Sequence, residues 1–380
     1  MFSRRKWMKV LGAGMSALDG WGQAPLRFPG KRSMLVQNDF PEDLETPAEY
    51  LNTWITPNDA FFVRQHLPRP KVDAASWRLK VGGMASNPLT LTLDDLKRMP
   101  QVKVPATLEC AGNGRANYRP KVPGLQWSKG AMGNAEWRGV RVADLLKRAG
   151  AGAGVQYGNF NGADQGVAKT PDFIRSIPMR KLTHEATIVA LEMNGAPLPE
   201  IHGFPARLIV PGWDGANWVK WVTEMELSAE PSKGFFFATG YRYPKYSPAP
   251  GSAVKPEDME VLEGMAVTSY FAHPAHGATA KKGIPLRLQG VAYGGENRVS
   301  RVEISTDGGA KWLDAKLSPQ NYPFAWRLFT FDWIPPERGY HVLCSRATDS
   351  AGRIQPVECP WNPGGYMYNA IERLGVMVEA

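Results

Sequence analysis

The sequence has few of the residues that build covalent frameworks. Its 380 residues include three cysteines, Cys110, Cys344 and Cys359. Three cysteines are too few for a disulfide scaffold. Cys344 and Cys359 could pair in an oxidising compartment or remain two buried thiols, and both alternatives leave Cys110 unpaired. An unpaired Cys110 is compatible with a dedicated chemical role.

Long apolar runs and dense basic clusters are also missing. No stretch reaches the roughly 18 apolar residues of a membrane span, so we expect no span. The net charge is +9, but the basic residues are scattered and their longest clusters are Arg4–Lys6 and Lys31–Arg32. Nucleic-acid binding needs a denser basic face, so no nucleic-acid partner is expected. A basic surface instead favours small anions or an acidic partner protein.

The N-terminus is similar to a twin-arginine export signal. Ser3–Lys9 reads SRRKWMK and precedes a small-residue apolar run, Val10–Leu18. We therefore expect residues 1–25 to direct export and the mature protein to be periplasmic. This route carries folded proteins, which suits a cofactor inserted before export. The alternative is a basic N-terminus with no signal, because Asp19 interrupts the apolar run.

The length and composition predict two globular domains. Residues 26–250 mix short strands and helices without a strict alternation, which predicts an α+β domain. A helix is expected at Leu91–Met99 with Thr92 as its N-cap, and another at Val142–Arg148 closed by Gly150. Asn194-Gly195 is a hairpin signal. Strands are expected at Trp77–Val81, Val102–Leu108, Ala206–Val210 and Val219–Leu227.

A second domain is expected over residues 255–380. The Pro/Ser/Ala-rich stretch Pro248–Pro256 reads as a linker, and short strands divided by turns follow it. This texture predicts an all-β immunoglobulin-like sandwich. The expected strands are Pro285–Tyr293, Val299–Thr306, Lys311–Leu317, Ala325–Trp333 and Tyr340–Thr348.

The most informative motif surrounds Cys110. The run Thr107–Arg115 reads TLECAGNGR. Its glycines let the backbone approach a neighbour closely, because they carry no Cβ. Arg115 sets a fixed positive charge near a potential thiolate, which suits a metal-bound sulfur beside an anionic substrate. The alternative is a buried cysteine next to a tight turn.

Four other segments share the character of Cys110–Arg115, each placing polar or charged side chains beside glycine, proline or aromatic residues. They are Phe61–Pro68 (FFVRQHLP), Gly158–Gly166 (GNFNGADQG), His202–Trp221 (HGFPARLIVPGWDGANWVKW) and Gly240–Pro244 (GYRYP). Together the segments offer a thiol, histidines, arginines, an aspartate, a lysine and a tyrosine. This inventory suits an anionic cofactor held by cations and backbone amides, with a soft thiolate on a metal.

The ordered motifs resemble those of the sulfite oxidase family of molybdenum enzymes, over roughly Phe61–Lys220. The C-terminal sandwich resembles that family's dimerisation domain. The resemblance implies a sulfite-oxidase-type molybdenum cofactor-binding domain at residues 26–250, a molybdenum–molybdopterin cofactor and a homodimer. It also implies that Cys110 binds the metal, and soft thiolate ligands suit such a site.

The resemblance assigns roles to individual positions. The implied catalytic residues are Cys110, Arg64, Arg115, Tyr241 and Trp127. The implied cofactor-binding residues are Phe62, Val63, Arg64, Gln65, His66, Cys110, Asp164, His202, Arg207, Trp218, Val219 and Lys220. Arg64 and Arg115 would bind the oxyanion in a forked geometry. Trp127 would line the substrate pocket. Tyr243 and Tyr246 are alternatives to Tyr241.

The sequence departs from animal members of the family, which have Asn where Gln65 stands and Arg where Gly114 stands. These differences indicate the bacterial sulfite dehydrogenase type. No haem-binding domain precedes the core in this sequence, so we expect no haem in this chain. Electrons would then leave to a separate acceptor such as a c-type cytochrome. The second domain argues against the monomeric methionine-sulfoxide reductases that share the cofactor fold.

These observations predict an exported molybdenum sulfite dehydrogenase, which oxidises the small anion sulfite to sulfate. One alternative is a sulfane dehydrogenase subunit of a thiosulfate-oxidising system. A different oxyanion or an S-oxide is another possible substrate. An alternative of another class is a non-catalytic binding module that keeps the fold and has lost the cofactor residues.

Overall fold

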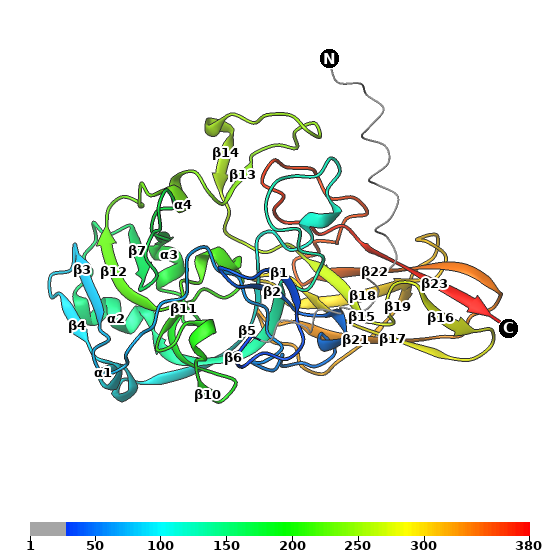
Figure 1. Cartoon of the computed structure of the whole chain (residues 1–380), viewed down its shortest axis with the longest axis horizontal. Helices are drawn as coiled ribbons and strands as arrows, with labels where there is room; N and C mark the ends of the chain where they lie inside the picture. The colour runs from blue at the N-terminus through cyan, green and yellow to red at the C-terminus, as the bar shows by residue number, and fades with distance from the viewer. Residues whose placement is uncertain (1–27) are drawn as a thin grey trace, which may run out of the picture.

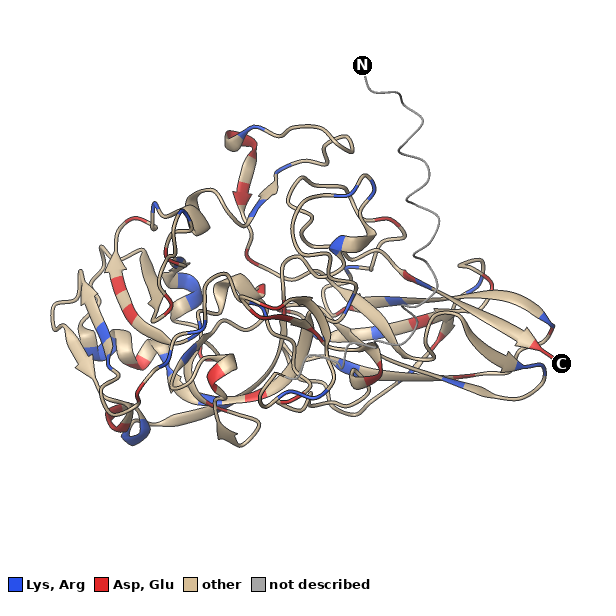
Figure 2. Ribbon diagram, viewed as in Figure 1, with Lys and Arg blue, Asp and Glu red and all other residues tan. Residues whose placement is uncertain are grey.

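The computed structural model describes residues 28–380, so the expected export signal at residues 1–25 lies outside the described residues. Figure 1 shows two lobes, one built mainly from the chain before residue 250 and an elongated one from the chain after residue 265. The C-terminus lies at the far end of the elongated lobe. Figure 2 shows basic and acidic residues interspersed over both lobes.

Two five-stranded sheets build the first domain. One contains β5 (Gln101–Glu109), β6 (Met132–Arg141), β9 (Ile188–Met193), β10 (Ala196–Pro197) and β11 (Arg207–Ile209). The other contains β3 (Leu79–Gly83), β4 (Leu89–Leu91), β7 (Tyr157–Gly162), β8 (Arg175–Pro178) and β12 (Val222–Ser228). A hairpin of β1 (Leu35–Asn38) and β2 (Asp43–Glu45) precedes them. The expected strands are present, with shifts of a few residues at their ends.

The α-helices of the described chain are short. They are α1 (Leu93–Arg98), α2 (Val142–Ala149), α3 (Met179–Leu182) and α4 (Phe235–Ala238). Thr92 caps α1 as predicted: its Oγ1 accepts a hydrogen bond from the Asp95 amide, and the Asp95 carboxylate accepts one from the Thr92 amide. Gly150 ends α2 in the left-handed conformation, also as predicted. Strands therefore dominate the expected α+β domain, and none of the helices in residues 28–380 could span a membrane.

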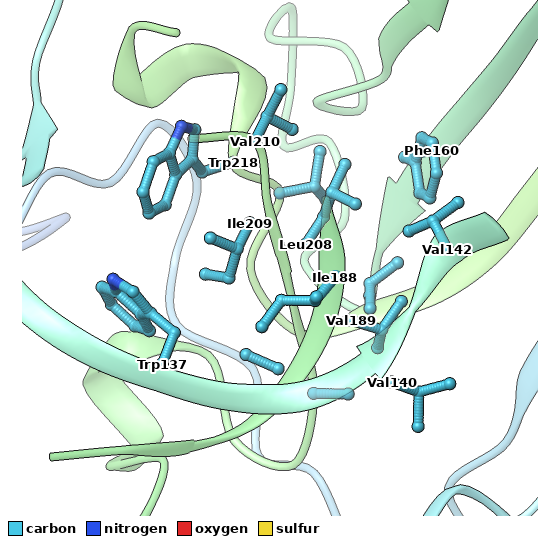
Figure 3. Packing of buried hydrophobic residues seen from close by; sticks show 14 of the residues in the cluster. Trp137, Val140, Val142, Phe160, Ile188, Val189, Leu208, Ile209, Val210 and Trp218 are labelled. Atoms are coloured by element: carbon cyan, nitrogen blue, oxygen red, sulfur yellow. The ribbon is translucent and has the colours of Figure 1, made fainter. Parts of the chain in front are cut away.

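The first domain's core surrounds strand β9. Figure 3 shows Ile188 and Val189 of β9 packed near Leu208 and Ile209 of β11, with Trp137 of β6 beside them. All are fully buried. Because β9 is covered on both faces, it reads as a continuous apolar run instead of alternating. The turn after it is the predicted Asn-Gly hairpin, with φ of 56° and 77° at its two central residues.

Two facing sheets build the second domain, as the sequence predicts for a β-sandwich. The four-stranded sheet contains β15 (Thr268–His273), β17 (Leu286–Tyr293), β21 (Arg327–Trp333) and β20 (Lys316–Leu317). The five-stranded sheet contains β16 (Ala278–Lys281), β23 (Glu372–Glu379), β22 (Gly339–Asp349), β18 (Val299–Ser305) and β19 (Leu313–Asp314). Side chains such as Phe271, Val302 and Leu343 fill the space between the sheets. That the sandwich is immunoglobulin-like stays a prediction.

The prediction of one strand at Lys311–Leu317 is wrong. The segment contains two short strands that belong to opposite sheets, since β19 pairs with β18 and β20 pairs with β21. The chain crosses between the sheets at Ala315, whose amide donates to the Val302 carbonyl at 2.9 Å. Alternating side chains fit either sheet, so sequence pattern alone could not show the switch.

The Pro-rich stretch expected to link the domains leads into a strand that still packs on the first domain. The Pro-rich stretch is an excursion between β13 (Arg242–Pro244) and β14 (Met259–Val261), which pair with each other. Beyond β14, the Leu262 amide donates to the Tyr241 carbonyl at 2.9 Å, and the Met265 amide to the Gly212 carbonyl at 3.0 Å. Residues 259–265 therefore pack on the first domain, and the sandwich begins at β15.

We predict that Leu208→Ala lowers the free energy of unfolding by about 2–5 kcal/mol, because it leaves a cavity in the core beside β9. Leu208 is fully buried, whereas Leu313 is 59% exposed. Leu313→Ala is the matched control and should change stability by less than about 0.5 kcal/mol. Urea unfolding and melting temperatures of both variants measure this. Equal losses in the two variants would contradict the assigned core.

Candidate functional site

Two neighbouring cavities meet at Cys110. The inner cavity holds about 700 Å³ of space free of protein atoms, and every predicted cofactor-binding residue lines it. The outer cavity holds about 870 Å³ of such space, part of it open to solvent. Four predicted residues, Arg64, His66, Cys110 and Tyr241, line both cavities. The thiol therefore lies between an enclosed space and a mouth.

The side chain of Asn113 shapes the loop Cys110–Asn113, which reads CAGN. Cys110 follows the end of β5, and its amide donates to the Ala131 carbonyl at 2.9 Å. The Asn113 side chain donates to Glu109 at 3.1 Å and accepts from the Ala131 amide at 3.0 Å. These bonds fix the turn that presents the thiol. Burial raises the pKa of the Cys110 thiol, and Arg64 and Arg115 oppose that shift.

Arg64 is held at the cavities by a buried carboxylate. Its guanidinium lies 3.2 Å from Asp43 of β2, and that carboxylate also accepts the Gln65 amide at 2.9 Å. Burial raises the pKa of Asp43, and Arg64 opposes the rise. The Arg64 side chain is 26% exposed. It is thus anchored at one edge and open toward both cavities.

Tyr241 and His66 form a pair at the boundary of the cavities. The Tyr241 hydroxyl lies 2.5 Å from His66 Nε2. Burial raises the Tyr241 pKa, whereas burial and then Arg64, Lys220 and Arg175 lower the His66 pKa well below its usual value. Both groups are therefore neutral, and they share one hydrogen bond. Tyr241 lines both cavities, whereas the alternatives Tyr243 and Tyr246 line neither. Its φ of 55° is strained for a bulky residue, as often found at functional sites.

Positive groups gather at the end of the inner cavity. His202, Arg207 and Lys220 line it together with Asp164. Burial, reinforced by Arg207, lowers the Lys220 pKa to about 7, while Asp164 opposes the shift. Burial also lowers the Arg207 pKa to about 9. An anion bound here would favour the charged forms and reverse these shifts.

Arg115 is held in a cradle of glycines at the outer cavity. A Cβ at Gly112, Gly124 or Gly365 would stand 2.5 Å, 2.8 Å and 2.9 Å from its side chain. Its Nη1 donates to the Leu125 carbonyl at 3.1 Å. Arg115 is only 8% exposed, and its side chain fits in this buried position because the three glycines carry no Cβ.

The second domain completes the outer cavity. Pro363, Gly364 and Tyr366 line it, and the Gly364 carbonyl accepts from Arg115 Nη2 at 3.1 Å. The Tyr366 ring stacks on Tyr241 at 5.4 Å between centroids. The Tyr366 carbonyl accepts from the Tyr118 hydroxyl at 2.7 Å. The substrate side of the site therefore depends on both domains.

Trp127 does not lie where the sequence analysis expected. It lines neither cavity, and its ring is fully buried in the first domain's core. The neighbouring Gly124 and Leu125 line the outer cavity instead. Leu125 and Gln126 are half-buried and Trp127 is fully buried, so the chain enters the core at this point. The other implied catalytic residues, Cys110, Arg64, Arg115 and Tyr241, all line the outer cavity.

Several residues that line the site or contact its side chains were not predicted from the sequence. Asp43 and Tyr366 lie far in sequence from every motif and reach the site through β2 and the second domain. Lys31 was counted among scattered basic residues, but its ammonium lies 2.6 Å from His202 Nε2. Arg175 is fully buried and donates to the Phe236 carbonyl. Only the spatial arrangement shows these contacts.

The inner cavity fits a pterin cofactor with a phosphate. Both amide atoms of Gln65 and the Nε of Arg207 are buried without hydrogen-bond partners in residues 28–380, and both residues line the cavity. A polar heterocycle with an anionic end would satisfy them and the cations. The described residues contain no group of three or more His, Cys, Asp or Glu side chains that could hold a metal alone. A metal bound through one protein thiolate and a cofactor agrees with this.

The chain matches two family descriptions, one for each domain. Residues 66–236 match the oxidoreductase molybdopterin binding domain, and residues 259–379 match the Mo-co oxidoreductase dimerisation domain. Among curated proteins, the sulfite oxidase of Gallus gallus is 36% identical over 381 residues, covering 95% of this chain and 81% of that protein. The sulfite oxidase of Arabidopsis thaliana is 31% identical, covering 93% of this chain and 95% of that protein.

A solved structure agrees with the sequence matches. The sulfane dehydrogenase SoxCD from Paracoccus pantotrophus superposes with a TM-score of 0.77 at 28% identity, covering 95% of this chain and 92% of that chain. The likeness therefore includes both domains. The chain belongs to the sulfite oxidase family and is a molybdopterin oxidoreductase that acts on sulfur compounds.

Proposed function

We propose that the protein is a molybdenum-dependent sulfite dehydrogenase. Sulfite and water become sulfate, two protons and two electrons, and the electrons pass to an external acceptor. One observation carries the proposal: Cys110 lies where the enclosed cavity meets the mouth, and Arg64 and Arg115 line that mouth. Fixed guanidinium groups there suit a small oxyanion approaching a thiolate-bound metal.

Residues of the inner cavity would hold the cofactor. Cys110 would ligate molybdenum, and His202, Arg207 and Lys220 would bind the phosphate end of the pterin. When bound, the molybdenum cofactor supplies the two-electron redox chemistry and the oxygen transfer. The protein supplies binding, orientation and charge around it.

At the mouth, the chain's own groups neutralise and orient the substrate. Arg115 still has free N–H donors after its bonds to two backbone carbonyls. Asp43 contacts one edge of the Arg64 guanidinium and leaves the other edge free. The neutral Tyr241–His66 pair adds a hydroxyl without adding charge. Apolar Phe236 and Tyr366 enclose the space and reduce its water. Charge–charge attraction is stronger in such a drier site.

A second candidate substrate is sulfane sulfur carried on a larger molecule. The outer cavity is partly open to solvent, so a sulfur atom can enter it while the molecule that carries the sulfur stays outside. Gly112, Gly124, Gly240 and Gly364 line it, and none of them places a side chain in it. The solved structure that resembles this chain is titled a sulfane dehydrogenase.

The remaining proposals concern the setting of the enzyme. We propose periplasmic location through twin-arginine export, a c-type cytochrome or another carrier as electron acceptor, and a homodimer. The dimerisation domain supports the last of these.

All three cysteines lie in the described residues and are free, so neither Cys344 nor Cys359 forms a disulfide in this structure.

We predict that Cys110→Ser retains the pterin but loses sulfite-dependent dye reduction to below about 1% of wild type, because a hydroxyl is a poor replacement for a soft thiolate. Cys344→Ser is the matched control, since Cys344 is a buried thiol in β22 that lines neither cavity. Extracted pterin fluorescence and turnover measure the two effects. Substantial activity in Cys110→Ser would rule out the ligand assignment.

We predict that Arg64→Ala lowers kcat/KM for sulfite by about 30- to 1000-fold, the loss of about 2–4 kcal/mol expected for one anion contact. Molybdenum content should be unchanged. Arg78→Ala is the control, because within residues 28–380 the Arg78 side chain donates only to the carbonyls of Ala75 and Trp77. Steady-state kinetics with elemental analysis test this. Unaltered sulfite kinetics in Arg64→Ala would remove Arg64 from the substrate site.

The direct test of the function compares donors. The molybdenum-loaded protein is given sulfite, or a persulfide of a small thiol, with cytochrome c or a dye as acceptor. We expect sulfite to support reduction at saturable rates. Reduction of the acceptor with the persulfide but not with sulfite would overturn the sulfite assignment in favour of the sulfane candidate. No reduction with either donor at full molybdenum loading would contradict both.

A further inference from the structure

The N-terminal arm of the first domain places a lysine behind the cation cluster of the inner cavity. Lys31 Nζ lies 2.7 Å from the carbonyl oxygens of Asn58 and Phe61, and 2.6 Å from His202 Nε2. Lys31 does not line either cavity. His202, in contrast, lines the inner cavity and is 2% exposed. Lys31 thus reaches the cavity only through His202.

The contacts of Lys31 account for all of its donors. An ammonium carries three N–H groups and no acceptor. Two of them go to carbonyl oxygens, which can only accept, so the third points to the imidazole. The Asn58 carbonyl also lies 3.3 Å from His202 Nε2 and would accept a hydrogen bond from that nitrogen if it were protonated. The ammonium is closer, at 2.6 Å, and can only donate, so the shorter contact favours an unprotonated Nε2 and a proton on Nδ1.

The remaining ring nitrogen is free for a ligand. His202 Nδ1 has no hydrogen-bond partner among residues 28–380. It is also not one of the fully buried polar atoms without a partner in those residues, so it remains accessible. Burial, then Lys31, Arg207 and Lys220, lower the His202 pKa well below its usual value, so the ring is neutral. Neighbouring Arg207 and Lys220 make an anion the natural occupant.

We propose that Lys31 is a positioning residue that fixes His202 as the Nδ1–H tautomer, so that the imidazole donates a hydrogen bond to the phosphate of the pterin cofactor. The proposal rests on the chain holding a phosphate-bearing pterin and not on which sulfur compound is oxidised. Lys31 would also add a second layer of positive charge behind that phosphate. The other tautomer would aim a lone pair at the anion and weaken binding.

A phosphate would in turn favour the charged lysine. Burial lowers the Lys31 pKa to about 7 in the structure without ligands, with Lys220 and Arg32 contributing and Asp59 opposing. A nearby dianion raises the pKa of a lysine. Filling the cavity therefore stabilises the ammonium that the proposed hydrogen-bond arrangement requires.

The test measures cofactor retention, which is independent of sulfur chemistry. Lys31→Met and Arg32→Met remove one positive charge each from adjacent positions, but Arg32 binds Asp59 at the surface at 2.6 Å. After dialysis of protein made in a pterin-producing host, we expect Lys31→Met to have lost bound pterin about tenfold faster or more, the effect of removing a hydrogen bond to a charged group. Arg32→Met should match wild type.

Coupling to His202 separates positioning from a general structural effect. We expect Lys31→Met to add nothing to the pterin loss of His202→Ala, because Lys31 acts through the ring. Fully additive losses would overturn the proposal. So would wild-type pterin retention in Lys31→Met.

A measurement on the wild-type holoenzyme decides the case even where Lys31→Met fails to fold. Side-chain ¹⁵N NMR of histidine-labelled protein, with the His202 signals assigned through His202→Ala, should show protonated Nδ1 and unprotonated Nε2. In Lys31→Met, that tautomer preference should weaken. Protonated Nε2 in the wild type would overturn the proposal.

Discussion

The site depends on positive charge that the fold holds away from water. Arg64, Arg207 and Lys220 line one enclosed cavity, and the carboxylates near them are those of Asp43 and Asp164. Burying charges without partners is costly, and the lowered pKa values of Arg207 and Lys220 express that cost. An anionic cofactor offsets it, which is why cofactor binding and the stability of this region are linked.

The remaining architecture serves to bring these groups to one thiol. Strand β5 delivers Cys110, the β1–β2 hairpin supplies the carboxylate that anchors Arg64, and the loop after β11 carries Lys220. The second domain then closes the mouth with the Gly364 carbonyl on Arg115. Substrate binding therefore depends on how the two domains pack. Tyr241, with its strained φ, lies at the contact between the domains.

Sequence reasoning predicted the parts of the site that lie in compact motifs. Chemistry within a few residues of Cys110, Arg64 or Lys220 leaves a local pattern, and these positions do converge. Lys31 and Tyr366 leave none, because their roles arise from contacts across 171 residues or between domains. Trp127 was predicted at the substrate pocket but lies in the core. An aromatic residue beside a motif is equally compatible with a cavity wall and with a core, so the sequence could not distinguish the two.

Anomalous X-ray diffraction at the molybdenum edge, from crystals of protein made in a pterin-producing host, tests the central claim most directly. The account places the molybdenum peak within bonding distance of Cys110 Sγ, between the inner cavity and the side chains of Arg64 and Arg115. A peak elsewhere, or full molybdenum occupancy with an unligated Cys110, would contradict it.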